Sequence, residues 1–429
     1  MKLNTKQTVL IGLSFASILA FWQFYDQVIP VILENHFGRS TLVTNAIMSI
    51  DNVLAIFMLP LFGALSDKTR SRMGRRTPYI LFGTVFAVAL MVIMSVLTEQ
   101  ASFLGFFFCL MALLVVMSIY RSPAVAYMPD VTPKPLRSKG NAVINLVGYV
   151  GGIFSTIVMT FLVTSKTAED GSVVYNSFIP IFIVVAAFML VTVLIMVFTL
   201  NENKIVREAA VDDGDDETSA AAGGKLEKPV FISLVFILLS VFLWFTAYNG
   251  VTTSFSRYFE NRYGVDAGGS SLYLTVATIA AIASFVPLGI ISSKLGRKKT
   301  ILIGVILMTV CYGAIFFLKT TGVVMYIIFA LVGIGWAGIN VNSFPMVVEM
   351  CHSSDVGKYT GYYYAFSMGA QIVTPLLSGL LITKLSYTVL FPYAVVFSVL
   401  SFVTMIFVKH GDSKPEEKKS LLEHFDVDD

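Results

Sequence analysis

Three ionisable side chains lie inside long apolar runs of the sequence. Asp26 lies in Phe21-Trp-Gln-Phe-Tyr-Asp-Gln-Val-Ile-Pro30, Asp51 lies in the next run, and Arg121 lies in Ser118-Ile-Tyr-Arg-Ser-Pro123. Insertion scales put the cost of a charge at the centre of a membrane helix at roughly 2.5 to 3.5 kcal/mol. Each of these residues therefore needs a partner or a function. An arginine at this depth stays charged and needs a carboxylate.

The two acids and the arginine have the chemistry of a switch that responds to protons. We expect Asp26 as the first choice and Asp51 as the second choice for the coupling carboxylate, with Arg121 as its partner. Protonation of the acid would free the arginine to bind another group. The alternative is a fixed ion pair that only holds the helices together. Trp22 lies one helical turn before Asp26, so both side chains would share one face of a helix.

The composition is that of a membrane protein. Of the 429 residues, 56% are hydrophobic and 13% are charged, whereas soluble domains carry about 25% charged residues. The formal net charge of +3 gives no reason to expect nucleic acid binding. Cys109, Cys311 and Cys351 show no metal-ligand spacing, so we expect neither a metal site nor a disulfide.

Apolar runs long enough to cross a bilayer, which takes about 20 residues, occur in two sets of six. The first set covers residues 8–33, 42–65, 79–98, 101–129, 140–164 and 177–200. The second set covers residues 229–258, 269–293, 300–318, 321–350, 357–383 and 386–408. Residues 201–228 are polar and predict a flexible cytoplasmic linker, and residues 409–429 predict a charged, mobile tail.

The basic residues orient this twelve-helix arrangement. The loop after the second run holds Lys68, Arg70, Arg72, Arg75 and Arg76, and 23 of the 30 Lys and Arg residues fall on its side of the membrane, against six on the other. Short loops rich in Lys and Arg stay in the cytoplasm. We therefore expect a multi-pass protein of the cell membrane with both termini cytoplasmic.

The two sets of runs look like copies of one unit. Gly63-Ala-Leu-Ser-Asp-Lys68 leads to Gly74-Arg-Arg, and Gly289-Ile-Ile-Ser-Ser-Lys294 leads to Gly296-Arg-Lys-Lys, each after the second run of its set. This duplication predicts an all-α membrane fold of two six-helix bundles, residues 1–200 and 229–408, with a binding site between them near the midplane.

The loop from Gly63 to Ile80 resembles the signature loop of the major facilitator superfamily. Its form Ser-Asp-Lys-Thr-Arg-Ser-Arg-x-Gly-Arg-Arg-x-Pro-Tyr is similar to that of sucrose-transporter-like permeases and of the glycoside-pentoside-hexuronide:cation symporters. The resemblance implies sugar import by alternating access. It also implies a place for Arg121 in the substrate and proton pathway, although Val116 and Met117 stand where plant sucrose transporters carry an acid.

The same loop holds candidate gating residues. They are Asp67, Arg72, Arg75 and Arg76. An acid at a helix end can interact with the positive end of another helix dipole. We expect Asp67 to contact the helix that begins near Gly357 in the other half, in one of the two conformations only.

Polar and aromatic side chains within the runs are candidates for substrate binding, because sugars offer apolar faces and many hydroxyls. These candidates are Trp22, Gln23, Asn145, Tyr149, Trp244, Tyr248, Asn249, Trp336, Asn340 and Gln371. Membrane proteins also carry tryptophans at the interface, and single polar groups often only join helices. Tyr362, Tyr363 and Tyr364 would point in three directions, so at most two of them would face a cavity.

Proton coupling is the expectation for the driving force. The melibiose-type sodium symporters carry a second acid directly before a proline in the second helix, whereas Leu59 precedes Pro60 here. One acid makes a poor oxygen cage for sodium. A sodium-coupled sugar symporter and an exporter of another small molecule are the alternatives. No nucleotide-binding loop or nucleophile triad is present in the sequence, so we expect no enzyme and no cofactor; we also expect a monomer.

Overall fold

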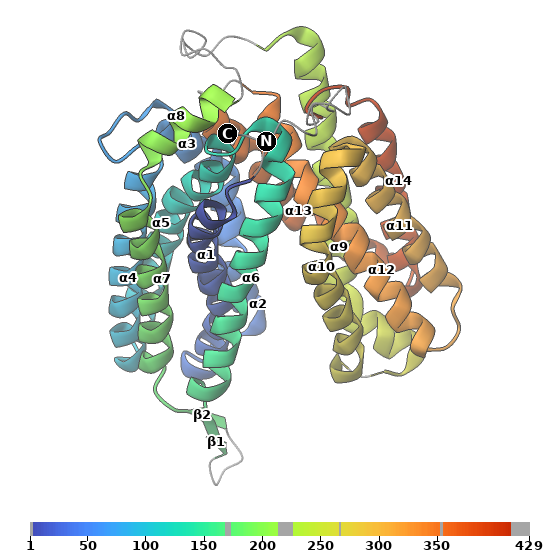
Figure 1. Ribbon diagram of the computed structural model, residues 1–429. Helices are drawn as coiled ribbons and strands as arrows, with labels where there is room; N and C mark the ends of the chain where they lie inside the picture. The colour runs from blue at the N-terminus through green and yellow to red at the C-terminus, as the bar shows by residue number, and fades with distance from the viewer. Residues whose placement is uncertain (1–2, 168–172, 213–225, 266, 352–354, 413–429) are drawn as a thin grey trace.

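The computed structural model describes residues 3–167, 173–212, 226–265, 267–351 and 355–412. Within them, twelve helices are long and apolar enough to cross a membrane. They form two groups that diverge from one end of the molecule (Figure 1). The predicted all-α membrane fold with twelve spanning helices is confirmed.

The N-terminal half contains α1 to α7. Their bounds are α1 (Thr5–Val31) with a π-helical extension (Ile32–His36), α2 (Thr41–Met48), α3 (Ile50–Lys68), α4 (Thr77–Glu99), α5 (Phe103–Asp130), α6 (Arg137–Leu162) and α7 (Ile179–Thr199). A 3-10 turn (Lys134–Leu136) precedes α6, and two short antiparallel strands, β1 (Ser165–Thr167) and β2 (Val173–Tyr175), join α6 to α7. The second predicted run is thus divided at Ser49, just before Asp51.

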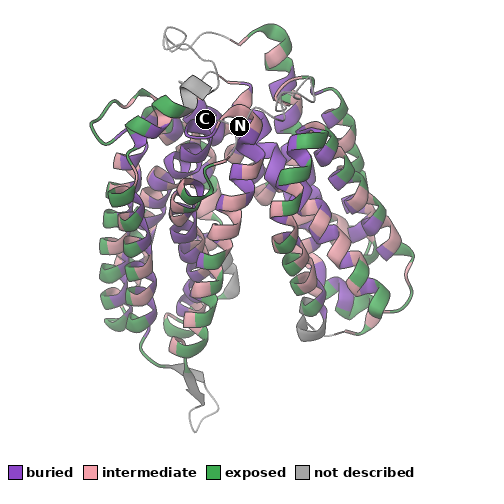
Figure 2. Ribbon diagram, viewed as in Figure 1, coloured by how far each residue is buried: buried purple, intermediate pink, exposed green. Residues whose placement is uncertain are grey.

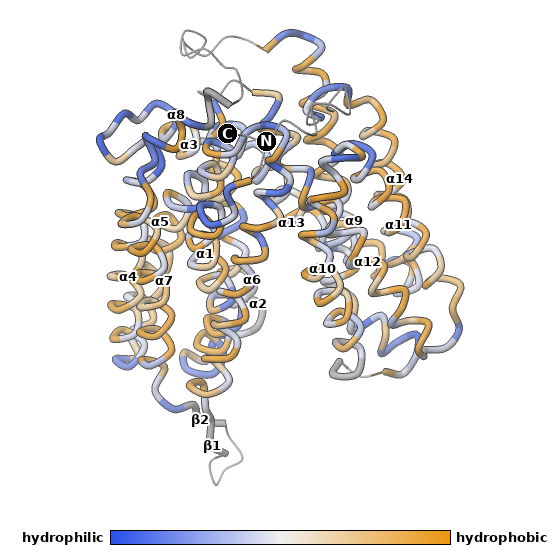
Figure 3. Tube along the Cα trace, viewed as in Figure 1, coloured by the Kyte–Doolittle hydropathy of each residue, from blue (hydrophilic) through white to orange (hydrophobic). Residues whose placement is uncertain are grey.

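The C-terminal half contains α9 to α14. Their bounds are α9 (Lys228–Tyr263), α10 (Ala267–Leu295), α11 (Arg297–Phe317), α12 (Val323–Glu349), α13 (Val356–Lys384) and α14 (Leu390–Ile406), with a 3-10 turn (Tyr387–Val389) before α14. Exposed residues and hydrophobic residues both occur along the outer helices of the two halves (Figures 2 and 3). The exposed large apolar residues include Phe198 at 84% and Phe317 at 78%. Such faces suit contact with lipid, because their exposure to water would cost free energy.

The halves pack closely at the end that carries residues 69–76, which we name the motif end. Gly63 of α3 lies so close to Gly357 of α13 that a Cβ on either would overlap the carbonyl of the other. One turn further along α13, a Cβ on Gly361 would overlap the backbone of Pro60. Small residues let the two helix backbones approach closely, and this contact joins the halves.

Part of the predicted linker is ordered. Residues Glu202–Asp212 form helix α8, which lies at the motif end (Figure 1). Glu202 is 2% exposed and Ile205 is 9% exposed. The prediction of a flexible segment is wrong for α8, because Glu202 binds backbone donors of the neighbouring loop. Residues 213–225 lie outside the described part of the chain.

Candidate functional site

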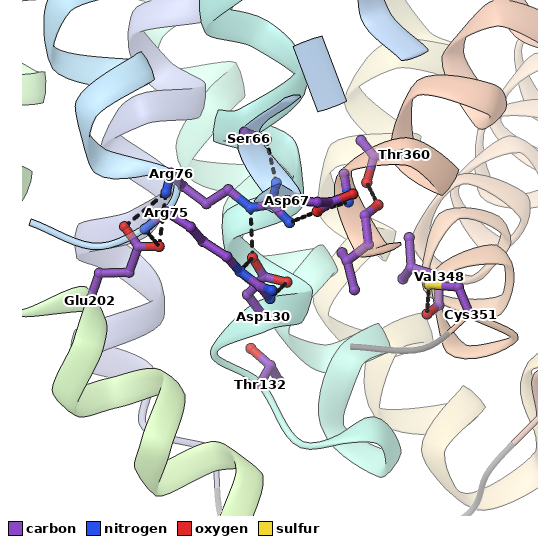
Figure 4. A network of polar contacts seen from close by, with 12 residues as sticks. Ser66, Asp67, Arg75, Arg76, Asp130, Thr132, Glu202, Val348, Cys351 and Thr360 are labelled. Atoms are coloured by element: carbon purple, nitrogen blue, oxygen red, sulfur yellow. Dashed lines mark hydrogen bonds and ion pairs between the residues drawn. The ribbon is translucent and has the colours of Figure 1, made fainter. Parts of the chain in front are cut away.

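A buried arginine organises the polar network at the motif end (Figure 4). The Arg76 side chain is fully buried. Its Nε donates to Asp130 Oδ2 at 2.7 Å, its Nη2 pairs with Asp67 Oδ1 at 2.5 Å, and its Nη1 donates to Ser66. This arrangement joins the ends of α3 and α5 to the start of α4. It gives the guanidinium two carboxylates, as a buried charge requires.

The two carboxylates also set the proton affinity of Arg76. Burial alone would lower the pKa of Arg76, but Asp130 and Asp67 outweigh that effect and raise the pKa above its ordinary value. The guanidinium therefore keeps its charge. A permanently charged group at this position fixes both acids in place.

Asp67 extends the network to the other half of the molecule. Its Oδ1 accepts from the backbone N–H of Gly357 at 2.7 Å, and its Oδ2 accepts from that of Lys358 at 2.8 Å. Both donors belong to the first turn of α13, where free N–H groups and the helix dipole favour an anion. The contact expected from the sequence between Asp67 and the helix near Gly357 is therefore present.

The other two predicted gating arginines differ from each other. Arg75 pairs with Asp130 through Nη2 at 2.6 Å and Nε at 3.1 Å. Arg72 is exposed, and in the described part of the chain it takes no part in this network. Its carbonyl accepts from Asn203 of α8 at 3.0 Å. The role of Arg72 in the gate stays a prediction.

Glu202 of α8 completes the network. Its carboxylate accepts from the backbone N–H groups of Arg75 at 2.8 Å, Arg76 at 2.9 Å and Thr77 at 2.8 Å, and from the Thr77 hydroxyl at 2.7 Å. These groups are the free donors at the start of α4. Gly74, at φ +105°, leaves no room for a Cβ beside Glu202. The acid thereby caps α4 from a distant part of the sequence.

The second repeat builds a related network around Arg297. This residue follows Gly296, whose φ of +102° matches that of Gly74. The Arg297 side chain is buried and pairs with Glu349 at the end of α12, and its backbone N–H donates to Asp412. Glu349 and Asp412 thus stand where Asp130 and Glu202 stand in the first repeat. The duplication inferred from the sequence extends to these acids.

The repeats differ in how they reach across to the opposite half. Ser293 stands where Asp67 stands in the first repeat, and its hydroxyl donates only within its own helix, to Ile290. Arg297 makes the contact instead, donating to Ser138 Oγ at 2.9 Å and to the carbonyl of Lys134. One repeat therefore uses a carboxylate and the other uses a guanidinium.

The chain after α14 also contributes to the motif end. His410 Nδ1 lies 2.8 Å from Ser233 Oγ, and the Gly411 carbonyl accepts from Arg297 at 3.2 Å. The expected mobility of the tail therefore does not hold for residues 409–412, because these residues bind α9 and α11. Residues 413–429 lie outside the described part of the chain.

A second polar site lies deeper between the halves. Arg121 of α5 lies over two aromatic rings, with its Cζ 5.2 Å from the ring centroid of Trp22 and 5.0 Å from that of Tyr364. Trp22 belongs to the N-terminal half and Tyr364 to the C-terminal half. The guanidinium therefore contacts both halves through cation–π interactions.

The structure brings Asp26 and Asp51 close to Arg121, but not into direct contact with it. Both carboxylates interact electrostatically with the guanidinium and with each other. In the described part of the chain, however, Arg121 forms no direct ion pair with either acid. In this conformation the partnership of Arg121 with the two acids is therefore an electrostatic attraction, and a direct ion pair stays a prediction.

The two acids have different surroundings. Asp26 is exposed, although it lies well inside the span of α1. Asp51 is half-buried, and its Oδ1 has no hydrogen-bond partner among the described residues. An exposed acid inside a span implies water at that depth, and an unpartnered oxygen is free to accept a proton or a ligand.

Three other predicted aromatic residues pack against neighbouring rings. Tyr248 and Trp336 stack with ring centroids 3.9 Å apart and planes 5° apart. Tyr149 of α6 packs against Phe285 of α10 with centroids 5.5 Å apart. Tyr248, Trp336 and Tyr149 are all half-buried. They offer ring faces near the boundary between the halves.

The other predicted binding residues have mixed placements. Asn141 donates to the carbonyl of Asn340 at 3.0 Å across the halves, while Asn145 and Asn340 donate to backbone carbonyls of their own helices. Asn249 is half-buried with an unpartnered amide nitrogen among the described residues. The side chains of Gln23 and Gln371 are half-buried.

Trp244 is placed differently from the prediction. Its side chain is 1% exposed and belongs to the main hydrophobic core. The helical spacing from Trp244 to Tyr248 is correct, but α9 turns Trp244 toward the interior of its own bundle. A substrate cannot reach it in this conformation.

Sequence reasoning missed three residues of the motif end: Asp130, Glu202 and Arg297. Asp130 and Glu202 each stand at or just past the end of a predicted run, where a charged residue is ordinarily a solvated terminus. Arg297 was counted only as a basic loop residue. The duplication held a signal for all three, because Asp130 and Glu202 have acidic counterparts in the other half and Arg297 follows Gly296 as Arg75 follows Gly74.

The sequence was compared with known families and proteins. It matches the family described as Major Facilitator Superfamily over residues 11–353 and 269–425. The chain belongs to this superfamily. Alpha-ketoglutarate permease of Escherichia coli (strain K12) is 32% identical over 134 residues, which cover 31% of this chain and 29% of that relative. The chain therefore matches less than a third of that curated relative.

Solved structures of superfamily members share the fold. The human organic anion transporter MFSD10 (TETRAN) superposes with a TM-score of 0.71 at 16% identity, covering 95% of this chain and 100% of that one. The E. coli fucose:proton symporter FucP gives 0.72 at 13% identity (94% and 98%), and the proton:xylose symporter XylE gives 0.70 at 15% identity (96% of each). These structures show the shared fold. As a member of the superfamily with twelve helices long and apolar enough to cross a membrane among its described residues, the chain is a multi-pass membrane transporter and not an enzyme.

Proposed function

We propose that this superfamily member imports a sugar, a di- or oligosaccharide or a glycoside, by proton-coupled alternating access. The observation that carries the proposal is Arg121, held between a ring of each half with Asp26 and Asp51 nearby. A group that contacts both halves responds to their relative movement. Its surroundings hold protonatable acids and aromatic faces, which are what a sugar:proton symporter needs.

In the proposed cycle the acids and the arginine couple proton binding to movement. Asp26 is exposed and so can exchange a proton with water. While Asp26 and Asp51 are charged, they attract Arg121; when one is protonated, that attraction weakens. Arg121 is then able to donate to a substrate hydroxyl, so that proton and sugar bind together.

The motif end forms the proposed cytoplasmic gate. Asp67 and Arg297 each bind the opposite half there, and both contacts must break before that end can open. The positive-inside rule supports placing this end in the cytoplasm of a cell membrane. The conformation is then one in which the cytoplasmic path is closed.

A panel uptake experiment tests the proposed function. The purified protein would be reconstituted in proteoliposomes and given radiolabelled mono- and disaccharides, with and without an inward proton gradient, in sodium-free buffer. We expect one sugar to accumulate only with the gradient. Accumulation that needs sodium, or no uptake of any sugar, would contradict the proposal.

A second substrate class is supported by one observation. Arg121 has no direct carboxylate partner in the described part of the chain, so a carboxylate on a substrate would pair with it. The partial match to alpha-ketoglutarate permease fits this alternative. Alpha-ketoglutarate therefore belongs in the uptake panel, and its accumulation in place of any sugar would favour an organic anion transporter.

The orientation can be tested independently. A cysteine at Ser219, which lies outside the described residues, would be placed in a background in which the native cysteines are replaced. We expect a membrane-impermeant thiol reagent to label it only after the cells are opened. Labelling from outside intact cells would reverse the proposed topology.

A further inference from the structure

A cavity of about 150 Å³ lies within the C-terminal half, among helices α9, α10, α11 and α12. Its buried walls include Tyr312, Phe329 and Val332, which are 0%, 1% and 4% exposed. An apolar cavity of roughly this volume is enough for one benzene ring. None of the coupling or gating residues described above lines it.

The cavity walls are mainly apolar, and their hydroxyl groups belong to Tyr248, Thr252, Thr278 and Tyr312. Of its polar residues, Thr252 donates its hydroxyl to the carbonyl of Tyr248 at 3.2 Å, and Thr278 donates to that of Leu274 at 2.9 Å. Tyr312 differs, because its buried hydroxyl has no hydrogen-bond partner among the described residues. The cavity thus offers apolar contact and one strong unsatisfied polar group.

The cavity adjoins the proposed substrate site. Tyr248 forms part of its wall and stacks on Trp336. Val332 lies one helical turn before Trp336 on α12, so the cavity continues along α12 from the stacked pair. A molecule that touched the stacked rings could place a substituent in the cavity without leaving the site.

The mouth of the cavity faces the space between the halves. Thr278 of α10 is exposed. It precedes Phe285 by seven residues and Gly289 by eleven, so the three share one face of the helix. Phe285 packs against Tyr149, and Gly289 lies against Ala142 of α6. Away from the motif end, α6 and α10 diverge (Figure 1).

We propose that this cavity binds the non-sugar part of a glycoside, a single aromatic ring that carries one oxygen able to accept from Tyr312. This inference rests on the proposed function as a sugar transporter. A second sugar ring fits the cavity less well than an aromatic ring, because the mainly apolar walls would leave several of its hydroxyls without partners. The preferred substrate is therefore an aryl glycoside rather than a disaccharide.

Binding of matched glycosides tests the proposal. Isothermal titration calorimetry would compare phenyl and methyl glycosides of glucose, galactose and xylose, in both anomers, on the purified full-length protein. We expect a phenyl glycoside to bind on the order of tenfold more tightly than its methyl counterpart, because the ring is removed from water. Equal affinities would overturn this inference and leave sugar transport standing. Binding of neither series would overturn both.

Two variants locate the effect in the cavity. Val332→Phe fills it and should abolish the preference for phenyl over methyl, while the methyl glycoside reports whether the protein is folded. Val324→Phe, at a position 57% exposed on the same helix, is the matched control and should keep the preference. In the unmodified protein a 4-nitrophenyl glycoside, which has an oxygen able to accept from Tyr312, should bind more tightly than the phenyl glycoside. Tyr312→Phe removes only the hydroxyl and should abolish this advantage. An unchanged preference in Val332→Phe and an unchanged advantage in Tyr312→Phe would contradict the proposal.

Discussion

Arg76 and Arg121 are two arginines of the same half, each with two carboxylates in reach, and they are held in opposite ways. Arg76 is paired directly with Asp67 and Asp130. Arg121 lies between two aromatic rings, and in the described part of the chain no carboxylate pairs with it directly. The difference separates a group that holds a conformation from a group that can change its partner.

The physical basis of the difference is the cost of an unpaired buried charge. Taking one partner from a fully paired buried network leaves a charge that the protein cannot solvate. Arg76 is in that position, so its network must be kept intact or broken as a unit. Arg121 makes weaker, less directional contacts, and Asp26 is already exposed. Its surroundings can therefore rearrange at small cost when a proton or substrate arrives.

Replacing each arginine by alanine tests this contrast and carries the largest expected effect on stability. Arg76→Ala leaves Asp67 and Asp130 without their shared partner, so we expect a loss of about 3 to 5 kcal/mol. Arg121→Ala breaks no direct ion pair and should cost on the order of 1 kcal/mol. Thermal unfolding of both variants in detergent would check the order.

Transport should depend strongly on Arg121, although stability depends on it only weakly. Arg121→Ala should fold yet lose both uphill uptake and exchange, because the donor to the substrate is gone. Equal loss of stability in the Arg76 and Arg121 variants would contradict the claim that the two arginines are held in different ways.

The next largest effect on stability is expected at Glu202 and Asp412, the acids that accept from the first backbone N–H groups of α4 and α11. Glu202→Gln removes the charge from a group that accepts from three backbone N–H groups and a hydroxyl, so we expect about 1 to 2 kcal/mol of destabilisation. Asp412→Asn is the matched change in the second repeat, where the Arg297 N–H donates to the acid, and should cost less. Denaturation midpoints of the two variants give the comparison. A larger loss for Asp412→Asn would show that the repeats are not matched in this way.

A smaller effect on stability is expected at the contact between the halves. Asp67→Asn keeps a side chain of the same shape and leaves Arg76 paired with Asp130, so we expect a loss of only about 1 kcal/mol, mainly at the start of α13. Transport should then slow several-fold while sugar affinity stays within a few-fold, because Asp67 is remote from Arg121. Ser293→Ala, the matching position, should change neither, since its hydroxyl bonds only within α10. Lost binding with normal turnover in Asp67→Asn would exclude a gating role.

The sequence predicted those features that depend on local pattern. Spans of about twenty apolar residues are visible without tertiary information, and so is the charge asymmetry that orients them. The contact between Asp67 and the first turn of α13 was also predictable, because a helix start has known free donors.

Other features depend on packing that the sequence pattern does not show. Trp244 and Trp336 have the same spacing to a polar residue, but one is in the core and the other stacks on Tyr248. Glu202 binds the start of α4 more than a hundred residues away, through a helix whose polar composition predicts a flexible linker. Only the folded arrangement reveals which charged residue ends in a buried network.

The proposed coupling role of Asp26 and Asp51 is tested most directly by measuring uphill accumulation and exchange separately. Asp26→Asn and Asp51→Asn would be reconstituted and measured at fixed pH without sodium, for uphill accumulation and for exchange of labelled against unlabelled sugar. We expect one of the two variants to lose accumulation and keep exchange, because only the return of the empty carrier needs deprotonation. Asp26 is our first choice for the coupling acid and Asp51 is our second choice. Uphill accumulation that persists in both variants would contradict the account.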